Sequence, residues 1–387
     1  MQVTLSLVLL TGAALLVGTL VHLETLDPGF DREHVLLVDA ELGGGELDAE
    51  QRRPLVLGLL EELRALPGVR AAGFTEMTPV SGNSVTEFVV AAGYRSLLEE
   101  DIEVHVHRVG DGYFASLGVP LLRGRDIADT DRSESEPVAV ISESMARRMF
   151  GGLDDVTGKH FHRRLNDVEV SEPIRVVGVV PDAKYRTLRD ESVPAAYFAL
   201  RQQPWFGRYP PTYQLLAQGE AAPLAALVRA TLEEAGGAGV ETSLLSAQLS
   251  ASLARERLMA SISVFFGGLA LFLAVIGLYG VMSFHVTRRF PEIGVRLALG
   301  SSAGGVFGLV LRQAARPVAV GLVFGALGSL AATRTLAALL YGFEPHDVRA
   351  LIFSALVLAL AALGSAALPA RRASRLDPAV VLRRDAT

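Results

Sequence analysis

The chain has 387 residues, of which 50% are hydrophobic, and its mean hydropathy of +0.36 is high for a domain that lives in water alone. This composition excludes an ordinary water-soluble protein and predicts that part of the chain lies in lipid. The formal net charge is −6, and we expect no nucleic-acid partner.

Four runs contain no Asp, Glu, Lys or Arg: residues 3–21, 258–286, 317–333 and 350–370. A helix needs about 20 mostly apolar residues to cross a bilayer core. The third run is short, but residues 306–311 extend it if Arg312 and Arg316 reach toward the lipid headgroups. The sequence therefore predicts four transmembrane helices, one N-terminal and three C-terminal, at about 1–23, 258–286, 306–333 and 350–370.

These runs have two alternative interpretations. Any single run could be a buried core helix, but the length of 258–286 disfavours this. The first run could be a cleaved signal peptide, but only Met1 and Gln2 precede it and no A-x-A cleavage site follows it. We therefore predict an uncleaved anchor.

The distribution of arginine predicts the orientation of the spans. Residues 24–257 carry 24 Lys and Arg against 37 Asp and Glu. A domain of this size crosses the membrane largely regardless of its charge, so the short flanks decide the orientation. The segment 288–302 and the tail 371–387 are arginine-rich. The positive-inside rule puts both in the cytoplasm and the acidic domain outside.

The domain at 24–257 reads as mixed α/β and is large enough to hold a core without disulfides. Strands are predicted at 136–142 and 173–180, and helices at 55–66 and 225–236. The stretch 201–213 is rich in proline and aromatic residues and marks a loop or a subdomain seam.

A search for catalytic chemistry in this domain yields little. The stretch 151–160 contains Gly158 and Lys159 but does not match the phosphate-loop motif G-x-x-x-x-G-K-[ST]. We therefore predict a turn before a strand. The pairs His105/His107 and His160/His162 have a spacing that could place two imidazoles on one face of a strand, as in a metal site. No further ligand motif accompanies them, so we favour ordinary strand or surface histidines. Ser142 reads as a helix N-cap rather than a nucleophile. We expect no catalytic residue, no bound cofactor and no metal site.

Small residues recur one helical turn apart in the third span. Gly304 and Gly308 form one such pair, and Gly321 and Gly325 form another. This spacing lets helix backbones approach closely in lipid. General tolerance of glycine in membrane helices explains the pairs equally well.

The order of elements and the motifs together resemble the MacB/FtsX-type ABC transporter permeases. The stretch "PEIGVRLALG" (291–300) is similar to the family's E-I-G-[IV]-R-x-A-[LI]-G segment. The stretch "PARRASRLDPAVVLR" (369–383) resembles its closing motif, and "GYFASLGVPLLRGRDIADTD" (112–131) is similar to its periplasmic domain. The resemblance runs nearly end to end, and it divides the chain into a first helix (1–23), a MacB-like periplasmic domain (24–257) and an FtsX-like permease domain (258–387).

The resemblance implies a non-catalytic subunit in the bacterial inner membrane. It would transmit ATP-driven motion of a separate cytoplasmic ATPase to the outer domain, for export or extraction of a molecule outside the membrane, because this chain carries no P-loop. Its partners would be that ATPase, a second permease unit, lipid, and a periplasmic adaptor or outer-membrane channel. The residues that match the coupling segment are Glu292, Ile293, Gly294, Arg296, Leu299 and Gly300, and those that match the tail motif are Pro369, Arg372, Asp377, Pro378 and Arg383.

The segment 291–300 also supports docking by its own chemistry. Glu292 and Arg296 are spaced to pair on one helix face, and its apolar residues supply contact area. The alternative is a juxtamembrane helix whose arginines contact lipid headgroups. We also expect that the chain forms the second half of a longer, duplicated permease or a truncated product.

Two other functions are alternatives to transport. An FtsX-like signalling scaffold would activate a periplasmic partner such as a cell-wall hydrolase. A membrane-tethered enzyme would need catalytic groups that the sequence does not offer.

Overall fold

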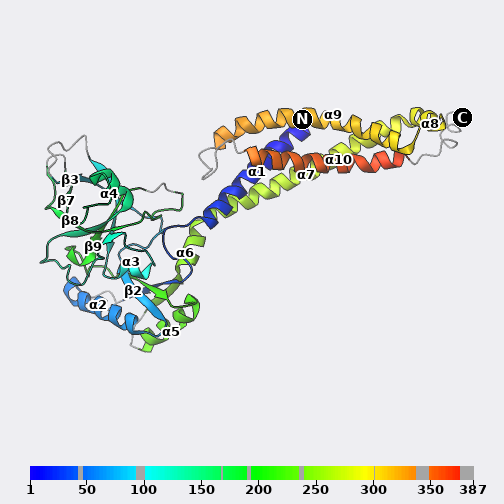
Figure 1. Ribbon diagram of the computed structural model, residues 1–387. Coiled ribbons are helices and arrows are strands. Elements are labelled where there is room, and N and C mark those ends of the chain that lie inside the picture. The colour runs from blue at the N-terminus through cyan, green and yellow to red at the C-terminus, as the bar shows by residue number, and fades with distance from the viewer. Residues whose placement is uncertain are drawn as a thin grey trace. The chain divides into compact units, whose positions relative to one another are not determined.

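The computed structural model describes residues 1–41, 47–92, 101–166, 169–189, 193–234, 239–299, 301–336 and 348–374 (Figure 1). The chain divides into two compact units. One unit comprises Met1–Thr25 and Ala254–Thr387, and the other comprises Leu26–Leu253. We describe each unit by itself.

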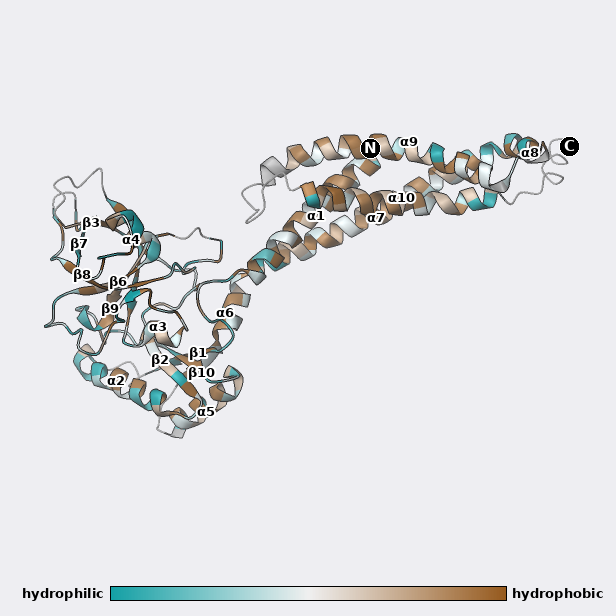
Figure 2. Ribbon diagram, viewed as in Figure 1, coloured by the Kyte–Doolittle hydropathy of each residue, from teal (hydrophilic) through white to brown (hydrophobic). Residues whose placement is uncertain are grey.

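The first unit is a bundle of long apolar helices (Figure 2). Within the described residues, four helices are long and apolar enough to cross a membrane, which confirms the predicted fold class. Each extends past the predicted span, because polar residues at the helix ends continue the backbone hydrogen bonding. The helices of this unit are α1 (Gln2–Thr25), α7 (Ala254–Arg288), α8 (Phe290–Ala298), α9 (Ala303–Leu336) and α10 (Val348–Ser374).

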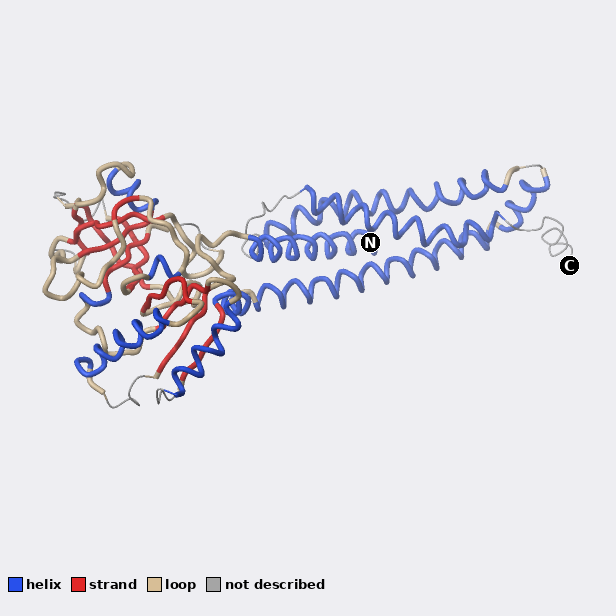
Figure 3. Tube along the Cα trace, turned by 60° about the horizontal axis from the view of Figure 1, so that its bottom comes forward, coloured by secondary structure: helices blue, strands red, loops and turns tan. Residues whose placement is uncertain are grey.

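The second unit combines helices and strands (Figure 3). Its strands follow the order β11-β1-β10-β2-β4-β3-β7-β8-β6-β9. The bounds of its strands are β1 (Val35–Ala40), β2 (Val69–Thr75), β3 (Val85–Ala91), β4 (Ile102–Val109), β5 (Arg123–Gly124), β6 (Val138–Ser142), β7 (His160–Arg163), β8 (Ile174–Val180), β9 (Ala195–Ala199), β10 (Thr212–Ala217) and β11 (Val240–Leu244). Its helices are α2 (Ala49–Ala65), α3 (Tyr113–Ser116), α4 (Glu143–Phe150), the 3-10 turn η2 (Leu200–Gln202), α5 (Ala221–Glu234) and α6 (Leu245–Ser252).

One lobe of this unit is the antiparallel sheet β11-β1-β10-β2 with α2 and α5 packed against it. Its core holds Phe74 and Tyr213, both fully buried. The Tyr213 hydroxyl donates a hydrogen bond of 2.9 Å to the carbonyl of Val56, which fastens α2 to the sheet. The helix α2 begins with a capping box of Asp48 and Gln51, so it starts earlier than the predicted 55–66.

The other lobe has a closed ring of strand pairs. The strands β3, β7, β8, β6, β9 and β4 pair in turn, and β4 closes the ring because it pairs in parallel with β9 and antiparallel with β3. Closure of the ring leaves these strands no free edge. A separate apolar core fills this lobe, with Val104, Phe161 and Val176 fully buried.

Several local predictions are confirmed in this lobe. The strands β6 and β8 match the predicted 136–142 and 173–180. Ser142 is the N-cap of α4 and accepts a hydrogen bond of 3.3 Å from the amide of Met145. The residues 151–160 form turns that lead into β7. The helix α5 overlaps the predicted 225–236 but begins four residues earlier, at Ala221.

An aromatic cluster with a buried histidine lies among β4, β9 and α3. The His107 ring is 4.2 Å from the Tyr185 ring and 5.3 Å from the Tyr197 ring, centroid to centroid. Burial lowers the pKa of His107 to about 3, and the positive charges of His105 and Arg108 act in the same direction. His107 is therefore neutral at physiological pH and serves as a core residue.

This burial predicts an acid-sensitive fold. Because the pKa of His107 is lower in the folded state than its usual 6.5, the unfolded state takes up the proton first, and stability is lost as the pH falls from 6.5 toward 3. The contribution amounts to about 3 kcal/mol between pH 7 and pH 4. We expect His107→Phe to reduce the fall of the thermal unfolding midpoint over this pH range.

The measurement compares variants, because Asp126 acts in the opposite direction. Burial raises the pKa of Asp126 to about 6, so its contribution to stability falls as the pH rises from about 4 to 6. Tyr197→Phe is the matched control: it alters the same cluster without removing a group that titrates in this range. Equal acid sensitivity in His107→Phe and Tyr197→Phe would contradict the assignment to His107.

Candidate functional site

The short helix α8 contains four of the six residues that match the coupling segment, and Leu299 follows it directly. Pro291 lies in its first turn, where a missing amide donor costs little. Arg296 donates a hydrogen bond of 2.8 Å from Nη2 to Oε1 of Glu292, and Nε of Arg289 lies 4.0 Å from Oε2 of the same carboxylate. Both side chains of the closer pair are about half exposed, so the pair contributes only about 0.5 kcal/mol to the helix. Its charges remain open to a partner.

The inner face of α8 is fixed to the helix bundle. Ile293 is buried and belongs to an apolar cluster with Met282 and Val286 of α7 and Val306 and Val310 of α9. Since side chains in such a cluster are closely packed, a displacement of α8 must displace the ends of α7 and α9 as well. Ile293 therefore supplies attachment to the bundle rather than exposed contact area.

The outer face of α8 is apolar as well as charged. The side chains of Val295 and Leu299 are 46% and 82% exposed. A small pocket lies on the other side of the helix, where Glu292 and Arg296 line it together with residues of α7 and α9 such as Gln313. Of the predicted segment, Gly300 lies outside the described residues, and only the helical backbone is described for Gly294.

The predicted glycine pairs have different surroundings in α9. A Cβ atom at Gly321 would lie 2.7 Å from Cβ of Val3, and one at Gly325 would lie 2.9 Å from Cβ of Leu7, so α1 and α9 approach closely along this pair. Apart from its chain neighbours and the backbone of its own helix, a Cβ placed at Gly304 or Gly308 would have no heavy atom within 4 Å in the described part of the chain. Close contact between helices thus involves Gly321 and Gly325, and not Gly304 and Gly308, within the described residues.

Polar side chains add to the contact of α1 with its neighbours. The Thr4 hydroxyl donates to the carbonyl of Gly321 at 3.3 Å, and the Ser6 hydroxyl donates to the carbonyl of Ala270 on α7 at 3.0 Å. Gln2 donates from Nε2 to the carbonyl of Leu273 at 2.6 Å. In a bilayer these hydrogen bonds have no water to compete with them.

The tail motif is described only in its first part. Pro369 is buried within α10, and Nη1 of Arg372 donates a hydrogen bond of 3.2 Å to the hydroxyl of Tyr279 on α7. This bond joins the ends of α10 and α7 near α8. The predicted residues Asp377, Pro378 and Arg383 lie outside the described residues.

Three histidines of the α/β unit have protein groups as their neighbours. His160 bonds Glu136 at 2.9 Å and His162 bonds the carbonyl of Ser171 at 2.8 Å, while His107 is enclosed by tyrosines. Among the described residues, no group of three or more His, Cys, Asp or Glu side chains is placed to hold a metal ion.

Comparison with known proteins identifies both parts of this arrangement. Residues 4–230 match the MacB-like periplasmic core domain, and residues 264–378 match the FtsX-like permease C-terminal domain. The chain belongs to the MacB/FtsX family of ABC transporter permeases. The permease is 28% identical over 339 residues to the macrolide export ATP-binding/permease protein MacB of Rhodospirillum rubrum, an alignment that covers 82% of this chain and 50% of the relative.

Two further matches cover different shares of the chain. The ABC transporter permease YvrN of Bacillus subtilis is 27% identical over 296 residues, which covers 72% of this chain and 69% of YvrN. The periplasmic region of MacB from Actinobacillus actinomycetemcomitans aligns with a TM-score of 0.36 at 15% identity, covering 57% of this chain and 92% of that structure. The permease thus spans about half the length of the MacB relative that it matches. The two matched domains are permease domains, and neither is an ATPase domain.

The contact of α1 with α9 predicts a selective effect of glycine substitution. Gly325→Ala would place a Cβ 2.9 Å from Leu7 Cβ and 3.2 Å from the carbonyl oxygen of Thr4, so the helices must move apart. We expect a loss of about 1–3 kcal/mol in stability, measured as a lower thermal unfolding midpoint in detergent micelles.

Gly308→Ala is the matched control on the same helix, because the new methyl group meets no atom within 4 Å. It should leave the midpoint unchanged or raise it, since alanine favours a helix by about 1 kcal/mol over glycine. An equal fall in both variants would show that helix contact at Gly325 is not the cause.

Proposed function

We propose that the permease couples a separate cytoplasmic ATPase to movement of the α/β unit on the opposite side of the membrane, for export or extraction of a molecule handled there. The observation that carries the proposal is the two-faced helix α8. Its inner side chain Ile293 is packed among α7 and α9, while Val295 and, just after the helix, Leu299 are exposed. The Glu292–Arg296 pair is half exposed at the edge of the contact with α7 and α9. A helix of this kind can receive a push from a partner and pass it to the bundle.

The proposed orientation rests on the arginines around α8. Arg288, Arg289 and Arg296 lie at or next to this helix, and Arg371 and Arg372 lie at the end of α10. Under the positive-inside rule these ends face the cytoplasm. The permease is then a multi-pass protein of the bacterial inner membrane with its α/β unit outside. ATP is bound and hydrolysed by the partner, and this chain needs no cofactor of its own.

The attachment of the α/β unit supports the transmission of motion. The unit begins after α1 and ends before α7, and Arg257 of α7 donates a hydrogen bond of 2.8 Å to Glu24 of α1. Both connections therefore leave the bundle from helices that are held side by side. Movement of α7 is passed to both ends of the inserted unit together. A second permease unit, and an adaptor or outer channel, would complete the assembly.

Leu299→Asp tests docking without disturbing the bundle. Leu299 is 82% exposed, so its replacement should leave the thermal unfolding midpoint of the chain unchanged. We expect it to weaken co-purification with the ATPase subunit that the wild-type chain brings down from its native membrane by about tenfold, which corresponds to about 1.4 kcal/mol.

The charged pair supplies a second test with an internal control. Glu292→Arg alone breaks the pair with Arg296, whereas Glu292→Arg combined with Arg296→Glu rebuilds it in reverse. If α8 docks through these charges, both variants lose the ATPase, because the partner meets the wrong charge at each position. Recovery of binding in the double variant would mean that the pair only stabilises the helix. Full binding in both of these variants and in Leu299→Asp would contradict docking at α8.

A further inference from the structure

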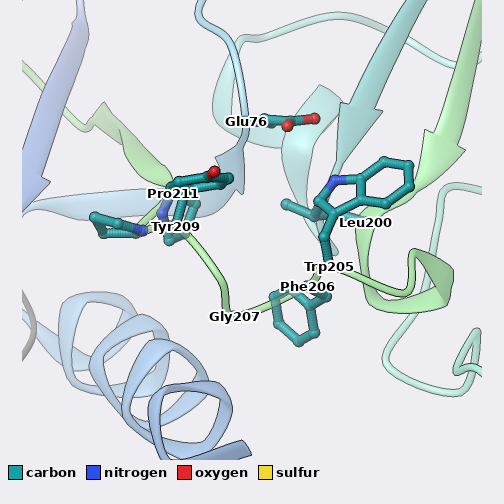
Figure 4. A pocket seen from close by; sticks show the side chains of 8 residues that line it. Glu76, Leu200, Trp205, Phe206, Gly207, Tyr209 and Pro211 are labelled. Atoms are coloured by element: carbon teal, nitrogen blue, oxygen red, sulfur yellow. The ribbon is translucent and has the colours of Figure 1, made fainter. Parts of the chain in front are cut away.

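A cavity of about 220 Å³ lies in the α/β unit, where the chain crosses between the two lobes (Figure 4). Glu76 follows the last residue of β2, and the other lining residues belong to the passage from β9 to β10. This passage is the proline- and aromatic-rich stretch that the sequence marks as a loop or seam. The cavity is lined by Glu76, Leu200, Trp205, Phe206, Gly207, Tyr209, Pro210 and Pro211.

The walls of the cavity are fixed by contacts behind them. Phe206 is buried and its ring stacks on Phe74 at 6.0 Å between centroids. Arg53 donates from Nε to the carbonyl of Phe206 at 2.8 Å, and Arg52 donates from Nη1 to the carbonyl of Gly207 at 2.9 Å. A Cβ at Gly207 would lie 2.5 Å from the carbonyl oxygen of Ala49, so only glycine fits this approach. A cavity built in this way exists before a ligand arrives, which lowers the entropy cost of binding.

Aromatic side chains stand on two sides of the cavity, with a carboxylate at its edge. Figure 4 shows Trp205 and Tyr209 on opposite sides and Glu76 between them at one end. The Tyr209 side chain needs no rearrangement to become accessible, since the residue is 63% exposed. Leu200 and Phe206 supply the remaining apolar surface.

The carboxylate of Glu76 keeps capacity to accept hydrogen bonds. Its ion pair with Arg108 is long, 3.4 Å from Nη1 to Oε2, and the Glu76 side chain is 32% exposed. Arg108 also lies 3.4 Å from Glu87 and 5.0 Å from the Trp205 ring centroid, so its charge is shared among several groups. An ionised carboxylate has about four acceptor positions, and this contact uses one of them.

From this combination we propose that the cavity binds an organic ammonium ion carried on a compact apolar body. A carboxylate attracts and hydrogen-bonds an ammonium group, and the faces of tryptophan and tyrosine attract a cation within about 6 Å of the ring. The carboxylate of Glu76 would repel an organic anion. A neutral ligand would gain only the apolar contacts. The site is independent of docking at α8, because it belongs to a different unit and needs neither ATP nor the ATPase.

The chain provides its own reporter for this site. Trp205 is the single tryptophan among the 387 residues, so tryptophan fluorescence of the full-length chain reports the cavity alone. Three probes share one apolar cage and absorb no light where tryptophan is excited: 1-adamantylammonium, 1-adamantanol and 1-adamantanecarboxylate. The experiment titrates each into the wild-type chain in detergent micelles, which contribute no tryptophan fluorescence.

We expect a saturable fluorescence change with the ammonium probe, at an affinity at least about tenfold above that of the alcohol. The carboxylate should give no saturable change. Absence of a saturable change with the ammonium probe, or equal affinities for all three probes, would overturn the proposal.

Variants then test the role of each wall. Glu76→Gln should weaken the ammonium probe about tenfold and leave the alcohol unchanged, whereas Glu103→Gln, an exposed glutamate on β4, should change neither. Tyr209→Ala removes a largely exposed side chain and should weaken both probes. An unchanged ammonium affinity in Glu76→Gln would contradict the site, and so would a loss of both probes in that variant, because Glu76 would then act only in folding.

Discussion

The close packing of α1 against α7 and α9 is the constraint on which the membrane unit depends. Lipid gives no hydrophobic drive for one apolar helix to prefer another, so contact must come from close approach and hydrogen bonds. Gly321 and Gly325 remove the side chains that would separate α9 from α1. Thr4 and Ser6 then reach backbone carbonyls on α9 and α7. An N-terminal helix is thereby built into a bundle whose other helices begin more than 200 residues later.

This packing determines how the inserted α/β unit is held. Because α1 and α7 are neighbours, both connections to the unit leave from adjacent helices, and the Arg257–Glu24 ion pair holds the two ends together. At the other end of α7, the cluster around Ile293 holds α8. A single long helix, α7, therefore connects the proposed docking surface to the unit that would respond to it. No catalytic group is needed for this role.

Much of the architecture could be predicted from the sequence, since the signals are local. Uncharged runs predict the spans, Ser142 predicts an N-cap, and the helix predicted at 55–66 ends at Ala65 in the structure. The ring of strands could not be predicted, because the parallel pairing of β4 with β9 joins segments about 90 residues apart. For α8 the sequence predicted a charged amphipathic segment, but the inward direction of Ile293 depends on where α7 and α9 lie. The composition of 201–213 predicted a loop or subdomain seam. The cavity could not be predicted, because Glu76, which completes its lining, lies at the end of a strand distant in the sequence.

The central claim is that α8 lies in the cytoplasm while the α/β unit lies on the opposite side. The chain contains no cysteine, so single cysteines can be placed at two exposed serines, Ser133→Cys in the α/β unit and Ser301→Cys just after α8. The direct measurement is labelling by a membrane-impermeant maleimide in spheroplasts before and after lysis. We predict that the Ser133→Cys chain is labelled in intact spheroplasts and the Ser301→Cys chain only after lysis. Labelling of both in intact spheroplasts, or of Ser301→Cys alone, would contradict the account.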